Sequence, residues 1–214
     1  MPPATAAAVE KLQQAAQAIG VDIDAWMARQ FSVYIDTLLL WRERLSLTGA
    51  DSAQLIVRDH VVDSLFLCRL IDSGQRVADI GSGAGFPGLP LAIARPDARF
   101  SLIESRRKRA NFLREVVRQA AIANAHIVDD RAEVAAKSLG SCFDVVTARA
   151  LGSITVFLAV AAPLLKSGGL AIAMKGPKAL AETMPESPDF RTLERIPYNP
   201  SPGVSHLLLT FKRN

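Results

Sequence analysis

The sequence predicts a doubly wound, Rossmann-like α/β fold, in which a mainly parallel sheet of seven strands ends in an antiparallel C-terminal hairpin and follows an N-terminal helical extension. Three observations lead to this prediction. Residues 1–70 carry only helical patterns, short apolar runs alternate with helical patterns from about residue 75, and a glycine-rich turn joins the first run to a helix. We expect residues 1–70 to form the extension and residues 71–214 to form the α/β domain.

The first helices are predicted from capping residues and apolar spacing. Residues 6–18 are rich in Ala and Gln and end before Gly20, and a second helix begins after Asp24 as its N-cap. A capping box at residues 51–54 predicts a short helix through Arg58, and a further helix should run from Asp63 or Ser64 to Leu70. The second helix has an apolar face made of Phe31, Tyr34, Ile35, Leu38 and Leu45.

Seven apolar runs are the predicted strands. They are Arg76–Ile80, Ala98–Glu104, Ala125–Val128, Phe143–Thr147, Gly169–Lys175, Thr192–Pro197 and His206–Phe211. Between the second and third runs lies a helical stripe of Phe112, Leu113, Val116, Val117 and Ala120. Residues 198–203 are too few for a crossover helix, so the last two strands should form an antiparallel hairpin. Five parallel strands ending in such a pair are the arrangement found in S-adenosylmethionine-dependent methyltransferases.

Composition limits the class of protein. Half of the 214 residues are hydrophobic and 21% are charged, which is typical of a compact protein. The longest apolar stretch, residues 154–165, contains Pro163 and is shorter than the about 20 residues of a membrane span. With no signal-peptide pattern at the N-terminus, we expect a cytoplasmic monomer that does not bind membranes. Cys68 and Cys142 lie far apart, which predicts buried thiols and neither a disulfide nor a metal site.

The charge distribution suits a polyanionic partner. The chain has 25 basic and 21 acidic residues and a pI near 9.3. Its first 60 residues carry 5 basic and 7 acidic side chains, so the basic excess lies in the remainder. Such an excess favours association with nucleic acid without determining the fold.

The turn after the first predicted strand is the most informative segment. It holds four glycines between Gly81 and Gly88, which let the backbone approach a ligand closely, and the helix that follows offers unpaired N–H groups. Gly83-x-Gly85-x-x-Gly88 matches the dinucleotide fingerprint, and Glu104 stands where that fingerprint has its ribose-binding acid. A nicotinamide-dependent oxidoreductase is therefore one alternative, and a turn that merely connects strand to helix is another.

Asp79 separates these interpretations. A carboxylate at the end of the strand repels a pyrophosphate but attracts the positive amino and sulfonium groups of S-adenosylmethionine. In addition, Gly81 rather than Gly83 follows the strand directly, unlike the first glycine of a dinucleotide loop. We therefore predict S-adenosylmethionine as the cofactor, with Asp79, Gly81 and Gly83 in its binding loop.

Further candidate ligand-binding residues follow the later strands. Glu104 can accept hydrogen bonds from ribose hydroxyls, although it can also be the N-cap of the helix from Arg106. Arg131-Ala132-Glu133 follows the third strand, at the edge where open α/β sheets bind ligands, with a solvated surface turn as the alternative. Arg149 follows the fourth strand and can reach a cofactor carboxylate or an RNA phosphate.

The sequence resembles the bacterial small-subunit ribosomal RNA methyltransferase G family, also called glucose-inhibited division protein B, from about Trp41 to Lys212. The motifs that carry the resemblance are Leu45-Ser-Leu-Thr48, Arg58-Asp-His-Val-Val-Asp-Ser-Leu65, Asp79-Ile-Gly-Ser-Gly-Ala-Gly-Phe-Pro-Gly88, Glu104-Ser, Lys108-Arg109, Phe112-Leu113, Arg131-Ala-Glu133, Ala148-Arg-Ala150 and Lys175-Gly-Pro177. The chain departs from the family at Ser46, where Asn is usual, and at Ser205-His206, where Arg-His is common.

The resemblance implies transfer of a methyl group from S-adenosylmethionine to N7 of guanine 527 in the 530 loop of 16S rRNA, either free or in an assembling 30S particle, and not to DNA. It also implies a set of cofactor contacts, which are Gly81, Phe86, Glu104, Ala132, Glu133 and Arg149. Guanine N7 exposes a lone pair, so no proton has to be removed and we expect no catalytic base. A third possibility, a non-catalytic RNA-binding assembly factor, does not explain why so many entropically costly glycines are kept.

The expected RNA contacts are mainly basic. Residues 106–109, with Arg114 and Arg118, form a cluster to which Lys175, Lys178, Lys212 and Arg213 add charge, although a solvated helix face is the plainer interpretation. Arg106, Arg107 and Lys175 are its principal candidates. Arg58, His60 and Asp63 are candidates on the substrate side, but His60 can be structural and Asp63 can be a helix cap. Aromatic residues make up only 6%, which favours one or two flipped bases over a stacking platform.

Overall fold

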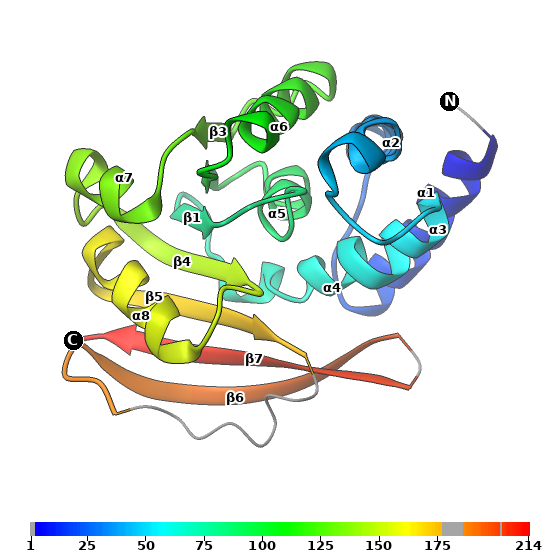
Figure 1. Ribbon diagram of the computed structural model, residues 1–214. Helices are drawn as coiled ribbons and strands as arrows, with labels where there is room; N and C mark the ends of the chain where they lie inside the picture. Colours follow the sequence, from blue (N-terminus) through cyan, green and yellow to red (C-terminus); the bar gives the residue numbers. More distant parts are fainter. Residues whose placement is uncertain (1–2, 177–185, 202) are drawn as a thin grey trace.

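The protein is an α/β structure in which helices cover both faces of one seven-stranded sheet, as the computed structural model shows for residues 3–176, 186–201 and 203–214 (Figure 1). The strands are β1 (Arg76–Ile80), β2 (Arg99–Ile103), β3 (Ala125–Val128), β4 (Phe143–Arg149), β5 (Leu165–Lys175), β6 (Phe190–Ser201) and β7 (Val204–Arg213). Their order across the sheet is β3-β2-β1-β4-β5-β7-β6.

The sheet topology confirms the predicted fold. Strands β3, β2, β1, β4 and β5 are mutually parallel, whereas β7 runs antiparallel to both β5 and β6. β5 begins at Leu165 and β4 continues to Arg149, so both are longer than the predicted strands. The order of the strands reverses between β1 and β4, and the crevice outside the carboxyl ends of these strands is where such sheets bind ligands.

The helices before β1 are α1 (Pro3–Ala18), α2 (Ala25–Leu45), α3 (Ala53–Ile56), the π-helical turn η1 (Val57–Val61), α4 (Val62–Leu65) and the 3-10 turn η2 (Cys68–Leu70). The later helices are α5 (Gly88–Ala94), α6 (Arg107–Gln119), α7 (Ala132–Leu139), α8 (Ile154–Ala161) and the 3-10 turn η3 (Ala162–Leu164). Asp24 caps α2 as predicted, because its carboxylate accepts the Met27 N–H at 2.7 Å.

The segment from Asp51 to Leu65 differs from the prediction. Ser52 rather than Asp51 is the N-cap, and its hydroxyl accepts the Leu55 N–H at 3.4 Å. Helical turns then continue without a break to Leu65, past the predicted end at Arg58. The run continues because one of its faces is buried throughout, with Ile56, Val57, Val61, Val62 and Leu65 in the core. Asp63 therefore lies inside a helical run and does not cap one.

The core has two parts, one on each face of the sheet, because successive strand side chains point in opposite directions. Val77 belongs to the cluster that includes buried side chains of α1, α2, α5 and α6, whereas its neighbour Ala78 belongs to the cluster under α7 and α8. In Figure 1, α2, α5 and α6 accordingly lie across the sheet from α7 and α8. Residues 3–70 thus share a core with the sheet, and the division into residues 1–70 and 71–214 remains a prediction.

Among the described residues, none of the helices combines the length and the apolar character that crossing a bilayer requires. The same residues contain no group of three His, Cys, Asp or Glu side chains placed to hold a metal ion. Cys68 is buried, and this burial raises the pKa of its thiol to about 12, so it stays protonated. Cys142 is only half-buried, because it lies in the exposed turn before β4 and not in the core as predicted.

Candidate functional site

The glycine loop after β1 has a backbone that only glycine adopts without strain. Gly81 and Gly83 have φ angles of +71° and +57°, in the left-handed region. A side chain at Gly81 would begin 3.5 Å from Leu151 of the loop after β4, and apart from the chain neighbours of Gly81 no other described residue lies within 4 Å. The loop is also fixed from the helical side, because the Tyr34 hydroxyl of α2 donates to the Ala84 carbonyl at 2.7 Å. The loop is therefore rigid, with its Gly81 side open.

Asp79 lies beneath this loop with 1% of its surface exposed. Its Oδ2 accepts the Gly88 N–H at 3.1 Å, and a Cβ on Gly88 would come within 2.7 Å of that oxygen, so only glycine lets α5 begin this close to β1. Its Oδ1 has no hydrogen-bond partner in the described part of the chain, and the same holds for the hydroxyl of Thr147, its register partner on β4. Burial raises the pKa of Asp79 to about 6. A cation bound at the loop would offset this buried charge.

Glu104 joins the loop to the next helix. It follows β2 and is 4% exposed, and its two carboxylate oxygens accept the Gly83 N–H at 2.9 Å and the Arg106 N–H at 2.7 Å. Arg106 rather than Glu104 is the N-cap of α6, so the alternative role of Glu104 as a cap is wrong. A carboxylate offers about four lone-pair sites, so two of them are left for further donors such as ribose hydroxyls.

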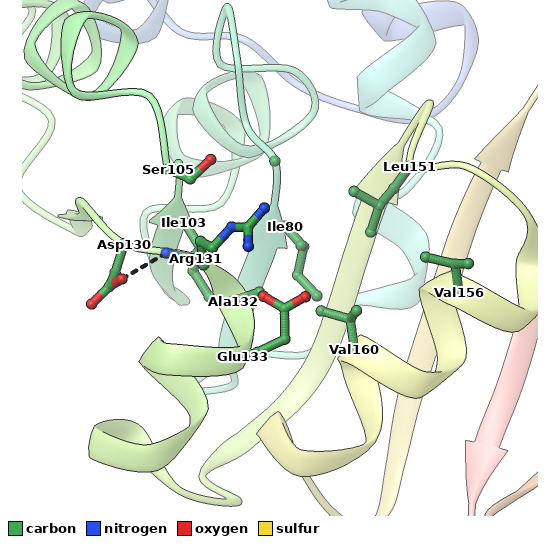
Figure 2. A pocket seen from close by; sticks show the side chains of 11 residues that line it. Ile80, Ile103, Ser105, Asp130, Arg131, Ala132, Glu133, Leu151, Val156 and Val160 are labelled. Carbon is green, nitrogen blue, oxygen red and sulfur yellow. Dashed lines mark hydrogen bonds between the residues drawn. The ribbon is translucent and has the colours of Figure 1, made fainter.

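A cavity of about 200 Å³ opens beside Gly81, at the carboxyl ends of β1 and β2 and the start of α7 (Figure 2). Its rim is polar, and Asp130 accepts the Arg131 N–H there at 2.8 Å. The predicted residues Gly81, Ala132 and Glu133 all line it. The complete lining is Ile80, Gly81, Ile103, Ser105, Asp130, Arg131, Ala132, Glu133, Leu151, Val156 and Val160.

The apolar wall of this cavity was missed in the sequence. Ile103 ends β2, Leu151 lies in the loop after β4, and Val156 belongs to α8. Val156 is 52% exposed and lies on the side of α8 that faces the cavity and not the core. A flat apolar ring fits between such side chains, with polar groups at its edge. The residues present thus suit an adenosyl group next to a cationic group at the loop.

Phe86 and Arg149 form a second part of the site, beside the loop. Phe86 is 4% exposed, and the guanidinium carbon of Arg149 lies 4.9 Å from the centre of its ring. The His60 ring centre is also 4.9 Å from that of Phe86. Arg149 is not among the residues that line the cavity of Figure 2, so the structure groups it with the substrate-side candidates.

His60 uses both of its ring nitrogens. Nε2 lies 2.8 Å from the Thr48 hydroxyl, and Nδ1 lies 2.8 Å from the Asp59 carbonyl and 3.1 Å from Arg149. Burial, helped by the positive charge of Arg149, lowers the pKa of His60, so the imidazole is neutral at pH 7. Because both nitrogens are engaged within the protein and the lowered pKa makes the ring a weaker base, His60 is poorly suited to take a proton from a substrate.

Asp63 is the most highly connected carboxylate of the site. Its side chain is 3% exposed; Oδ1 accepts from the Tyr198 hydroxyl at 2.6 Å and lies 2.8 Å from Nδ1 of His206. Oδ2 faces Arg149 at 3.5 Å. Burial and the charge of Asp63 raise the pKa of Tyr198, which keeps its hydroxyl protonated as the donor. Because Asp63 lies inside α4 and not at a helix end, the predicted alternative of a helix cap is wrong, and no local pattern in the sequence indicates Tyr198 as its partner.

The basic residues do not form one surface. Arg106 and Arg107 are exposed at the start of α6, whereas Arg58 pairs with Asp59, and Lys175 donates to the Gly152 carbonyl. Two further arginines of α6 also have acidic partners, which are Asp129 for Arg114 and Glu115 for Arg118.

The expected contribution of Lys212 and Arg213 to this cluster is wrong. Lys212 pairs with Leu170 and Arg213 donates to the Leu165 carbonyl, so both lie at the start of β5, at the opposite edge of the sheet from the loop. They reach this edge because β7 runs antiparallel to β5. Lys178 and the Pro177 of the family motif lie outside the described residues.

The fold and the site together define a Rossmann-like methyltransferase. Among solved structures, the cofactor-bound protein Rv0187 from MTB matches with a TM-score of 0.60 and 21% identity, covering 84% of this chain and 89% of that chain. The predicted O-methyltransferase Atu636 from Agrobacterium tumefaciens matches with a TM-score of 0.58 and 25% identity, covering 72% and 79%.

A family model described as rRNA small subunit methyltransferase G matches residues 27–199. The chain is 39% identical over 170 residues to the ribosomal RNA small subunit methyltransferase G of Desulfitobacterium hafniense, covering 78% of this chain and 71% of the relative. It is 31% identical over 206 residues to that of Neisseria gonorrhoeae, covering 95% and 98%. The chain belongs to the rRNA small subunit methyltransferase G family, which confirms the resemblance seen in the sequence. The predicted cofactor, S-adenosylmethionine, agrees with membership in a methyltransferase family.

Proposed function

We propose that this chain transfers the methyl group of S-adenosylmethionine to N7 of a guanine, guanine 527 in the 530 loop of 16S rRNA. The observation that carries the proposal is the rigid glycine loop, whose open side at Gly81 adjoins a partly apolar cavity and whose backbone is held by buried Glu104. When bound there, S-adenosylmethionine supplies a methyl group on a positively charged sulfur, ready for direct displacement.

Different residues of the site would bind different parts of this cofactor. We assign the ribose to the free lone pairs of Glu104 and the edge of the adenine to Ala132 and Glu133 at the start of α7. The apolar side chains of Ile103 and Leu151 cover its faces. Asp79, Gly81 and Gly83 form the side of the loop toward the charged end of the cofactor, where the buried carboxylate of Asp79 favours a cation. Phe86 belongs to the same loop, and its ring lies against Arg149 and His60.

A nicotinamide dinucleotide fits this loop less well. Two buried carboxylates, Asp79 and Glu104, flank the glycines, and in the described part of the chain neither accepts a hydrogen bond from a basic side chain. A pyrophosphate would bring two negative charges beside them, which costs free energy in a poorly solvated site. The same carboxylates attract the amino and sulfonium groups of S-adenosylmethionine. The charge of the loop therefore favours the methyl donor.

The surroundings of Phe86 support a target atom that needs no deprotonation. His60 is neutral with both nitrogens engaged, and both carboxylate oxygens of Asp63 face donors within the protein. Guanine N7 carries an unprotonated lone pair, so positioning and electrostatics can supply the catalysis. An exocyclic amine would need a different loop after β4, where this chain has Ala148-Arg-Ala150.

The RNA would approach from the carboxyl edge of the sheet. Arg106 and Arg107 are exposed there and can contact phosphates, and Arg58 and Lys175 supply charge from neighbouring elements. Arg149, His60 and Asp63 lie next to the loop, where the target base must reach the methyl group. We propose 16S rRNA, free or within an assembling 30S particle, as the partner.

The decisive experiment is methylation of 16S rRNA and of 30S particles from a strain that lacks this modification, using S-adenosylmethionine labelled in its methyl group. We expect one labelled N7-methylguanine in the 530 loop, located by borohydride and aniline cleavage, and no label with Gly81→Val. Titrations with S-adenosylhomocysteine and NADH test the cofactor separately. Label on another atom or base would refute the proposed target, RNA binding without label would favour an assembly factor, and binding of NADH alone would favour an oxidoreductase.

A further inference from the structure

A buried hydrogen-bond cluster joins three parts of the chain that are far apart in the sequence. Its centre is Asp63 in the helical run before β1, and its other members are Tyr198 on β6, His206 on β7 and Arg149 at the end of β4. We define these four residues as the Asp63 cluster. It reaches the glycine loop through Arg149, whose guanidinium lies against the ring of Phe86.

The hairpin side of the Asp63 cluster is fixed by strand register. Tyr198 and His206 are directly opposite each other on β6 and β7, so their side chains project together and both contact Oδ1 of Asp63. The two rings also contact each other edge to face, with centres 5.7 Å apart. Both donors therefore leave Oδ2 facing Arg149, which orients the carboxylate.

The Arg149 side of the cluster is less firmly held. The Arg149 side chain is 25% exposed, and Asp63 is its one carboxylate partner within 4 Å among the described residues. At 3.5 Å the contact is long for a hydrogen bond, so its attraction is mainly Coulombic and depends on the charge of Asp63. A half-buried arginine that loses its counter-charge moves its head group toward water. Nδ1 of His60 lies 3.1 Å from the guanidinium but carries no negative charge, so the position of Arg149 over Phe86 depends on the charge of Asp63.

We propose that Asp63 is a positioning residue for methyl transfer, which holds the Arg149 guanidinium against the glycine loop, and that Tyr198 and His206 make this position depend on the C-terminal hairpin. The inference rests on the proposed function, because Arg149 acts on rRNA methylation only if the chain performs it. It assigns the Arg-x-His-x-x-Asp motif a role in organising the site, in place of direct RNA contact by Asp63.

The test combines two readouts on the full chain. The first is the side-chain ¹⁵N spectrum of Arg149, assigned with Arg149→Lys, because rotation of a guanidinium slows when its N–H groups are held. The second is the single-turnover rate of rRNA methylation at saturating S-adenosylmethionine and RNA. The variants are Asp63→Asn and Tyr198→Phe, and Thr210→Val is the matched control. Thr210 also bonds across the hairpin, to Glu194, but does not contact the Asp63 cluster.

We expect Asp63→Asn to speed the rotation of the Arg149 guanidinium in the ¹⁵N spectrum. The same variant should slow methyl transfer about 5- to 50-fold, a typical size of coupling between residues in contact. In an Arg149→Gln background, which lacks the positive charge that Asp63 attracts, the same change should slow transfer less than about twofold, because its route of action is already lost. Thr210→Val should leave the rotation of the Arg149 guanidinium as slow as in the parent protein. Equal fold-changes in both backgrounds would show that Asp63 acts only through stability and would overturn the proposal.

The spectrum separates this inference from the proposed function. If the Arg149 guanidinium rotates as slowly in Asp63→Asn as in the parent protein, the inference is overturned, whatever the activity. A signal that depends on Asp63 in a parent protein that methylates no rRNA overturns the proposed function alone. If Asp63→Asn does not fold, Tyr198→Phe decides, since it removes one hydroxyl and keeps the charge: an unchanged Arg149 signal and rate would then refute control by the hairpin.

Discussion

Replacing Glu104 with Gln changes one atom of the site and removes its ability to hold two backbone donors at once. The carboxylate accepts from Gly83 N–H and from Arg106 N–H, one on each oxygen. An amide has one acceptor oxygen and one NH₂ group, so one of these N–H groups would face another donor. The chain cannot relieve this clash by flipping the amide, because the clash then moves to the other N–H.

The magnitude follows from these two contacts. Leaving one buried N–H without an acceptor costs about 1–3 kcal/mol, and this loss acts on the free protein as well as on the complex. If Glu104 also holds the ribose, a further charge-assisted hydrogen bond worth about 1.5–3 kcal/mol is weakened only in the complex. We therefore expect Glu104→Gln to lower the free energy of unfolding by about 1–3 kcal/mol and to weaken cofactor binding about 10- to 100-fold.

The assay is isothermal titration with S-adenosylhomocysteine alongside urea unfolding of the free protein. Glu115→Gln is the matched control, because Glu115 pairs with Arg118 on the outer side of α6 and faces no ligand. It should leave affinity within about 1.5-fold of the parent. A Glu104→Gln protein that is less stable yet binds S-adenosylhomocysteine as tightly as the parent would refute the ribose assignment and leave Glu104 as a support of the loop.

Three further predictions concern charge and pH. Burial raises the pKa of Asp79 to about 6, above its ordinary value of 3.8, so its contribution to stability is present near pH 4 and lost as the pH rises through 6. Asp79→Asn should therefore be about 2–4 kcal/mol more stable than the parent at pH 7 in urea unfolding, but bind S-adenosylhomocysteine more weakly; lower stability at pH 7 would contradict this. Because the pKa of His60 is lowered, the single-turnover rate should be flat from pH 6.5 to 8, and a tenfold rise that His60→Ala abolishes would reveal a missed base. Replacing Arg106 and Arg107 with Ala should reduce the log–log salt slope of RNA binding by about 1.4, whereas Arg191→Ala, at the opposite edge of the sheet, should not change it.

The features that the sequence predicted well are those set by neighbours along the chain. The cap at Asp24, the strand at Arg76–Ile80 and the apolar stripe of α6 depend on periodicity and on residues a few positions apart. The glycine loop belongs to the same class, because a positive φ can be inferred from the residue type itself. The position of β7 between β5 and β6 could not be predicted, since the same hairpin can pair with β5 through either strand.

The candidate site was predicted in part for the same reason. Gly81, Ala132 and Glu133 lie in one cavity because they follow parallel strands, whose carboxyl ends meet at one edge. The partners of Asp63 lie 135 and 143 residues away, and nothing in the local pattern around them indicates a shared carboxylate. The extension of the helix beyond Arg58 was also hidden, because burial against the rest of the fold outweighs a weak local end signal.

The insertion of β7 between β5 and β6 has a consequence for the order in which the molecule can assemble. Among the strands of the described residues, β6 pairs with β7 alone, so it cannot join the sheet until the residues after it have been made and have paired with β5. Until then Asp63 lacks both Tyr198 and His206, and a charge that is buried in the native structure must stay hydrated. A chain that stops within β7 would lack an inner strand of the sheet and could not bring Tyr198 and His206 to Asp63. Completion of the fold therefore depends on the last residues of the chain.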